Sequence, residues 1–154
     1  MGYRDFITKY ADYILSLEDS MTDCNGTHEK MTAVEWRDAI DKENEDHARD
    51  IKRGFYDSDN MPHIFTFEEI TWIIESLEEN GFVKTGEEAL WYVPYSGEND
   101  GCHVDWGNGF YDLEDAKREL EKLYTEGYEN AHIAVIDMSG NEAMCIAELS
   151  IEDI

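Results

Sequence analysis

The chain has 154 residues, of which 42% are hydrophobic and 12% aromatic. This is enough apolar material for one folded domain over residues 1–154 and excludes a wholly disordered protein. Its 37 Asp and Glu residues outnumber 12 Lys and Arg, so the net charge is −25. Proteins bind nucleic acids and anionic membranes through clustered Lys and Arg, so this charge excludes direct binding to either.

The negative charge is unevenly distributed along the chain. Residues 1–53 contain 13 acidic and 8 basic residues, a net charge of −5, whereas residues 54–154 contain 24 and 4, a net charge of −20. A small domain is ordinarily soluble with a net charge of about 2 to 8 in magnitude. The excess in the second part therefore predicts a basic protein partner.

The features that report on location indicate a cytoplasmic protein. No apolar run reaches the roughly 18 to 20 residues of a membrane span, and residues 1–10 follow an amphipathic pattern instead of a signal-peptide core. The three cysteines, Cys24, Cys102 and Cys145, are odd in number and widely separated, which is typical of reduced thiols.

Three helices are predicted before residue 82. Apolar residues at three- and four-residue steps predict the first over about 3–17. A capping box that begins at Thr32 starts the second, which runs to about Arg53, and its narrow apolar side places it at the periphery. A second capping box at Thr66 starts the third, and Gly81 follows its end.

A β-rich part with one helix is predicted over about 82–154, after a helical part over about 1–81. Strands are expected at 82–85, 90–95, 131–138 and 142–149, and a helix at 112–126. Each pair of strands forms a hairpin, the first across a turn at Gly86. The order α-α-α-β-β-α-β-β predicts an α+β fold with a small antiparallel sheet, made of two hairpins, and helices on one face.

Common motifs of hydrolases and nucleotide-binding enzymes are absent, which predicts a protein that is not an enzyme and needs no cofactor. Two partial metal patterns are also present. The first has calcium-loop spacing but lacks the oxygen ligand and the glycine required between its members, Asp57, Asp59 and Glu68. The second matches no common zinc spacing: Cys24, His28, Cys102 and His103. We therefore predict no metal site.

The predicted helix after Thr66 contains no Lys or Arg up to Asn80. Its apolar side is expected to consist of Phe67, Ile70, Ile73, Ile74 and Leu77. The opposite side carries Glu68, Glu75 and Glu79, with Trp72 beside them. Unopposed acids four residues apart repel each other, and ordinary solvated helices alternate the sign of their charges.

The rise of an α-helix separates Glu75 from Glu79 by about 6 Å along the axis and Glu68 from Glu75 by about 10 Å. These separations are comparable to one to three phosphate steps of about 3.4 Å on a DNA strand. Glu68, Trp72, Glu75 and Glu79 are therefore predicted to bind the partner, with Trp72 as an exposed anchor. In the alternative interpretation, Trp72 packs under a neighbouring loop and the acids only confer solubility.

A glycine-rich segment, residues 96–109, carries further acids at Glu98, Asp100 and Asp105. A loop of this length in a small domain is usually functional or mobile. The three acids are therefore predicted to complete the partner-binding surface, because a glycine-rich loop can adapt to the channel of a partner protein.

By its size, its charge and its combination of acidic runs with aromatic residues, the chain resembles the phage- and plasmid-encoded DNA mimics that inhibit host defence nucleases, the anti-CRISPR and antirestriction inhibitors. The resemblance is one of composition, mainly over residues 54–154, and includes no family motif. It implies a small cytoplasmic inhibitor that blocks the nucleic-acid channel of a CRISPR effector or restriction enzyme. The more balanced residues 1–53 fit scaffolding or the formation of a homodimer.

Two other classes of function remain open at this stage. An acidic regulatory or antitoxin-like module would bind a basic partner other than a nuclease through the same surface. A carboxylate- or metal-dependent enzyme would require a cleft with two acids in different environments instead of an exposed acidic face.

Overall fold

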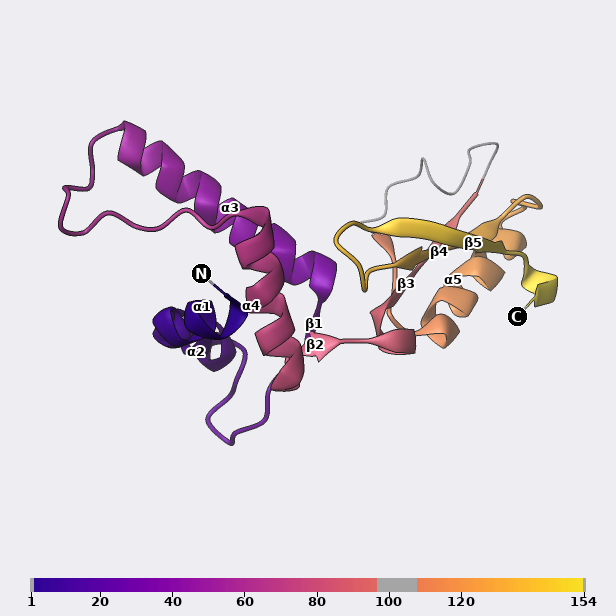
Figure 1. Cartoon of the computed structure of the whole chain (residues 1–154). Helices are drawn as coiled ribbons and strands as arrows, with labels where there is room; N and C mark the ends of the chain where they lie inside the picture. The colour runs from indigo at the N-terminus through magenta and orange to yellow at the C-terminus, as the bar shows by residue number, and fades with distance from the viewer. Residues whose placement is uncertain (1, 97–107, 154) are drawn as a thin grey trace. The chain divides into compact units, whose positions relative to one another are not determined.

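The computed structural model describes residues 2–96 and 108–153, and the chain forms two compact units, Met1–Lys84 and Thr85–Ile154 (Figure 1). The described residues contain five α-helices, a three-stranded antiparallel sheet and a two-stranded parallel sheet, which confirms the mixed helix and sheet content. The boundary between the units is close to the predicted change from the helical to the β-rich part. The grouping of residues 1–154 into one domain stays a prediction.

The first unit consists of four helices and two short strands. They are α1 (Tyr3–Lys9), α2 (Ala11–Ser20), β1 (Met31–Thr32), α3 (Ala33–Lys52), α4 (Phe67–Glu79) and β2 (Val83–Lys84). The predicted helix over 3–17 is two helices, because the backbone leaves the helical conformation at Tyr10 (φ −107°, ψ 22°). The break lets Phe6 of α1 and Ile14 of α2 both enter the core.

Helix α4 lies at the centre of this unit and contacts α1, α2 and α3 (Figure 1). Its side chains Ile73 and Leu77 are fully buried. The prediction that the second helix is peripheral is wrong for the first half of α3, where Trp36 and Ile40 belong to the core. The Trp36 indole N–H also donates a hydrogen bond of 2.9 Å to the Phe82 carbonyl, an anchor that the helical pattern of α3 does not reveal.

Both predicted capping boxes are confirmed. The side chains of Thr32 and Thr66 each accept a hydrogen bond of 3.2 Å from the backbone N–H three residues later. In turn, the carboxylates of Glu35 and Glu69 accept a hydrogen bond from the backbone N–H of the threonine. The two caps differ in burial, because Thr32 is fully buried and also belongs to β1, whereas Thr66 is exposed.

This difference in burial leads to a prediction for Thr32→Ala and Thr66→Ala. Loss of a helix cap typically lowers stability by about 1 kcal/mol, and burial raises the penalty for groups left without a partner. We expect Thr66→Ala to lower the free energy of unfolding by roughly 1 kcal/mol and Thr32→Ala by roughly 2 kcal/mol. Urea denaturation of the two variants measures the difference, and equal losses would contradict the added role of burial.

The first predicted hairpin, between residues 82–85 and 90–95, does not form. Strand β2 instead pairs in parallel with β1, and β3 (Leu90–Tyr95) pairs with β4 (His132–Asp137). Phe82 and Val83 are buried in the core of the first unit, which commits β2 to that unit. The intervening residues Gly86–Ala89 form a 3₁₀ turn, which replaces the expected tight hairpin turn.

The second unit is an antiparallel sheet in the order β3-β4-β5 with α5 (Leu113–Thr125) packed on one face (Figure 1). Strands β4 and β5 (Met144–Leu149) form the second predicted hairpin, which is confirmed. Asp112 caps α5, and Gly127 follows it with a φ of +99°, a conformation that favours glycine. On the α5 face, Ala116 and Leu120 pack with Ile133. Across residues 2–96 and 108–153, no helix has the length and apolar content to span a membrane.

Candidate acidic interface on α4

Helix α4 presents a stripe of carboxylates on the surface of the first unit. Glu68, Glu75 and Glu79 are all exposed and follow one another at intervals of seven and four residues, which keeps them on one side of the helix. Within the part of the chain that the structure describes, none of the three takes part in an ion pair. The predicted separations of about 6 and 10 Å along the axis therefore apply to three accessible charges.

The phenol of Tyr3, at the start of α1, lies beside the end of this stripe. Burial raises the pKa of Tyr3, and the negative charges of Glu79 and Glu75 raise it further, together with a side-chain hydrogen bond to Glu79. These effects require the two carboxylates to lie close to the Tyr3 hydroxyl. The phenol is neutral, so it leaves the charge of Glu79 uncompensated.

Trp72 packs inside the stripe, between α4 and α1. Its ring centroid lies 5.4 Å from that of Phe6 and 6.3 Å from that of Tyr3, and the side chain is only partly exposed. It packs against the core of the first unit. Trp72 is covered as in the alternative interpretation, but helix α1 covers it and not a loop. Trp72 thus fixes α4 against α1, while the glutamates form the accessible part of the stripe.

Two acids that the sequence analysis did not select extend the stripe at the end of α4. Glu78 is exposed, and Glu18 of α2 accepts a hydrogen bond of 2.7 Å from the Asn80 side chain. Glu18 is 62 residues from Asn80 in the sequence, so no local sequence pattern could identify it as part of this surface. The last turn of α4 has no basic residue, although a helix C-terminus favours positive charge. We call the set Glu18, Glu68, Glu75, Glu78 and Glu79 the acidic edge.

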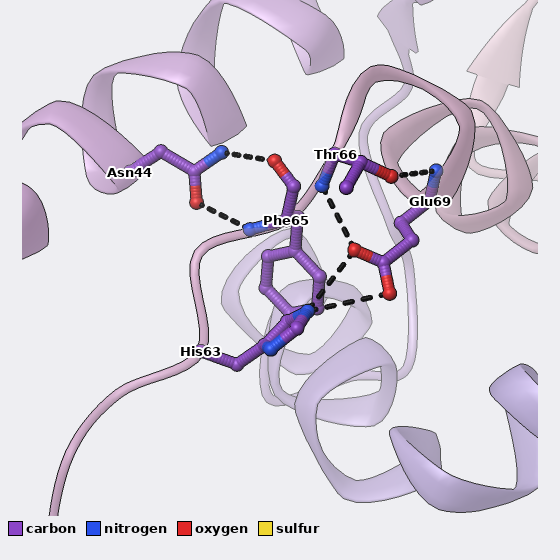
Figure 2. A network of polar contacts seen from close by, with 5 residues as sticks. All are labelled: Asn44, His63, Phe65, Thr66 and Glu69. Atoms are coloured by element: carbon purple, nitrogen blue, oxygen red, sulfur yellow. Dashed lines mark hydrogen bonds and ion pairs between the residues drawn. The ribbon is translucent and has the colours of Figure 1, made fainter.

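A polar network holds the first turn of α4 in place (Figure 2). Asn44 of α3 forms two hydrogen bonds, of 3.0 and 3.1 Å, with the backbone of Phe65, and His63 lies 3.0 Å from the Glu69 carboxylate. Burial alone would raise the pKa of Glu69, but hydrogen bonds from Thr66 and His63 outweigh it, so that the pKa is lowered. The network fixes where α4 begins and thereby the direction of the acidic edge.

The lowered pKa makes the stabilising effect of Glu69 pH-dependent. A carboxyl whose pKa is lower in the folded state than its ordinary value of 4.5 stabilises the fold above that value, and the effect is lost as the pH falls below it. Urea unfolding of wild type and Glu69→Gln should therefore differ at pH 7 and converge toward pH 3. Glu68→Gln, the same change in charge one residue earlier, is the control; a Glu69→Gln effect of equal size at both pH values would contradict the prediction.

Phe67 belongs to the predicted apolar side of the helix but is not buried with the other members of that side. The side chain is 62% exposed, and its ring lies 4.1 Å from the guanidinium carbon of Arg37, which is buried on α3. Arg37 also donates a hydrogen bond of 2.7 Å to Thr71 of α4. A cation over an aromatic face explains why an apolar side chain at this position is held at the surface.

The remaining predicted site residues are not placed in the structure. Glu98, Asp100 and Asp105 lie outside the described residues, as do Cys102 and His103 of the zinc pattern. The acidic edge therefore contains three of the predicted acids.

The other members of the two metal patterns have structural contacts. His28 stacks on Phe82 at 4.2 Å, and its Nε2 lies 3.1 Å from the Gly81 carbonyl. Asp57 accepts hydrogen bonds from the backbone of Asp59 and Asn60, which closes a local turn. In the described ranges, no three His, Cys, Asp or Glu side chains are grouped closely enough to hold a metal ion.

A cavity of about 600 Å³ in the second unit is relevant to the enzyme alternative. Its lining includes Tyr95, Asn108, Phe110, Glu119 and Leu123. Glu119 is the single carboxylate among these described lining residues, whereas acid–base catalysis by carboxylates needs a pair in different environments. Among the described carboxylates, Glu69 and Asp153 have a shifted pKa, and in each case hydrogen bonds that cap a helix or close a turn lower it.

No protein-family model, curated protein or solved structure matches this chain significantly. The functional argument therefore depends on the geometry and charge of the chain itself.

Proposed function

We propose that this protein is a small acidic inhibitor that occupies the nucleic-acid-binding surface of a defence nuclease, such as a CRISPR effector or a restriction enzyme. Its carboxylates would take the place of backbone phosphates in the Lys and Arg sites of that surface. The protein would act by occupancy alone, without catalysis and without a cofactor.

The acidic edge is the observation that carries this proposal. Three exposed carboxylates on α4 have no ion pair with any described residue, and the helix carries no base between Phe67 and Glu79. Solubility does not require such an arrangement, because mixed charges provide it without like-charge repulsion. Lys and Arg side chains on a partner surface would pair favourably with these carboxylates and offset their mutual repulsion.

The spacing of the acidic edge also favours a nucleic-acid-binding partner. The α4 carboxylates are separated by about 6 and 10 Å along the helix axis, close to the Debye length of about 8 Å at physiological ionic strength. They therefore act jointly on an approaching surface. A surface built for DNA presents cations at the phosphate spacing, so one helix can engage several of its Lys and Arg side chains.

The experiment measures inhibition and its salt dependence together. Purified protein is added to DNA cleavage assays with a panel of CRISPR effectors and restriction endonucleases, and complexes are challenged with unlabelled duplex DNA. We expect at least one nuclease to be inhibited, DNA to compete, and the association rate to fall at least about tenfold from 50 to 500 mM NaCl, because salt screens electrostatic steering. Binding that DNA does not displace would instead support an acidic regulatory or antitoxin-like module, and a salt-insensitive association rate would contradict charge mimicry.

A further inference from the structure

Strand β5 forms an edge of the sheet in the second unit. Among the described residues its one neighbouring strand is β4, so no described strand pairs with the opposite side of β5 (Figure 1). Unpaired groups on an edge strand form a template for pairing with another chain, and natural proteins usually protect such edges.

Two large apolar side chains on β5 are exposed. Met144 is 63% and Ile146 55% exposed, and neither belongs to a described core cluster of the second unit. Their neighbours Cys145 and Leu149 do pack against these clusters. The register shifts between Val135 and Ile136, which makes Ile146 the extra residue of a β-bulge and turns it away from both packed faces.

The part of the sequence that contains β5 carries acidic residues and no Lys or Arg. From Leu123 to the end, the sequence has no Lys or Arg and seven acids: Glu126, Glu129, Asp137, Glu142, Glu148, Glu152 and Asp153. Edge strands are commonly protected by lysines, and this one has none. The acids oppose pairing with a second copy of the chain, because two identical edges would bring like charges together.

We propose that β5, along the side that faces away from β4, binds an extended segment of a basic protein by strand addition. Backbone hydrogen bonds along the edge would hold the segment, apolar side chains of the segment would cover Met144 and Ile146, and its Lys or Arg side chains would lie in the negative field of the hairpin. This site is distinct from the acidic edge of α4. Strand addition at β5 does not require the partner to bind nucleic acid, so this proposal can be tested independently of the proposed function.

The test uses the full chain and a fluorescent, end-blocked nine-residue peptide of alternating Val and Lys. A second peptide has the two central Val residues replaced by Pro, which keeps the charge but removes ladder hydrogen bonds. Fluorescence anisotropy should show at least tenfold tighter binding of the first peptide. Hydrogen exchange should show new protection of β5 amides in its presence.

Matched variants separate strand addition from general charge attraction. Ile146→Lys and Met144→Lys should each weaken binding of the first peptide at least tenfold, whereas Leu15→Lys, at a 53% exposed position on α2, adds the same charge and should change it less than twofold. Thermal melting of each variant verifies that it is folded. Equal affinity for both peptides, or no effect of either β5 variant, would overturn the proposal. A dimer in sedimentation that Ile146→Lys dissociates would assign the edge to a second copy and would also overturn it.

Discussion

Reversing the charges of Glu68, Glu75 and Glu79 to Lys is expected to weaken binding to the basic partner at least 100-fold at physiological salt. Each reversal replaces a favourable pairing with a repulsion, and like charges brought together at an interface oppose binding strongly. A 100-fold loss corresponds to about 2.8 kcal/mol, or roughly 1 kcal/mol for each position, which is modest for charges facing Lys or Arg. Surface plasmon resonance with an inhibited nuclease measures the change.

A matched control separates the local effect from the change in net charge. Glu29, Glu126 and Glu129 are also exposed, and their joint reversal to Lys changes the net charge by the same amount at positions that are not part of α4. We expect this control to change affinity less than tenfold, mainly through the association rate. Equal losses in both triple variants would attribute binding to net charge and would remove α4 from the interface.

The α4 reversal should leave the protein folded. Glu75 and Glu79 repel each other as an i,i+4 pair, which destabilises the helix by about 0.2–0.5 kcal/mol. Reversal also places Lys beside Glu69 and Glu78, but it removes the interaction of the Glu79 carboxylate with the Tyr3 phenol. These effects are small and of opposite sign, so the melting temperature should change by only about 2–4 °C in either direction. A loss of binding with an unchanged melting curve is therefore a loss of contact.

The elements that the sequence predicted well are those with local signals. The capping boxes at Thr32 and Thr66 begin α3 and α4, because side chain and backbone three residues apart satisfy each other without any distant partner. The hairpin of β4 and β5 formed for a similar reason, since its two apolar strands are joined by a short polar connection at 139–141. The exposure of Glu68, Glu75 and Glu79 followed from the amphipathic pattern of α4.

The elements that were predicted wrongly depend on distant partners. The segment at 82–85 has the composition of a hairpin strand, but β1 and Trp36, more than forty residues earlier, determine where it pairs. Phe67 was grouped with the apolar side because the helical pattern does not include Arg37, whose guanidinium holds the ring at the surface. Trp72 was predicted to be exposed, but it packs on Phe6 of α1, and the helical pattern of α4 does not include this distant contact.

The contacts of Trp72 lead to the largest expected change in stability. Its ring packs on Phe6 and Tyr3, so Trp72→Ala leaves a cavity between α4 and α1. Replacing a buried Trp by Ala typically lowers stability by about 3–5 kcal/mol, and because Trp72 is only partly buried we expect a loss of about 2–3 kcal/mol. For a unit of this size the melting temperature should fall by roughly 10 °C or more, which thermal unfolding followed by circular dichroism measures.

Trp72→Phe is the matched variant, because it keeps an aromatic ring against α1 and should retain more than half of the lost stability. Binding of the folded fraction to an inhibited nuclease, measured well below the melting temperature, distinguishes the two roles of this residue. If Trp72 only positions α4, Trp72→Ala should lower the affinity for the nuclease because α4 is displaced. Trp72→Phe, which keeps a ring against α1, should then restore the affinity. If Trp72→Ala kept full stability and lost affinity, the indole would contact the partner directly, and the packing on Phe6 would not be its main contribution.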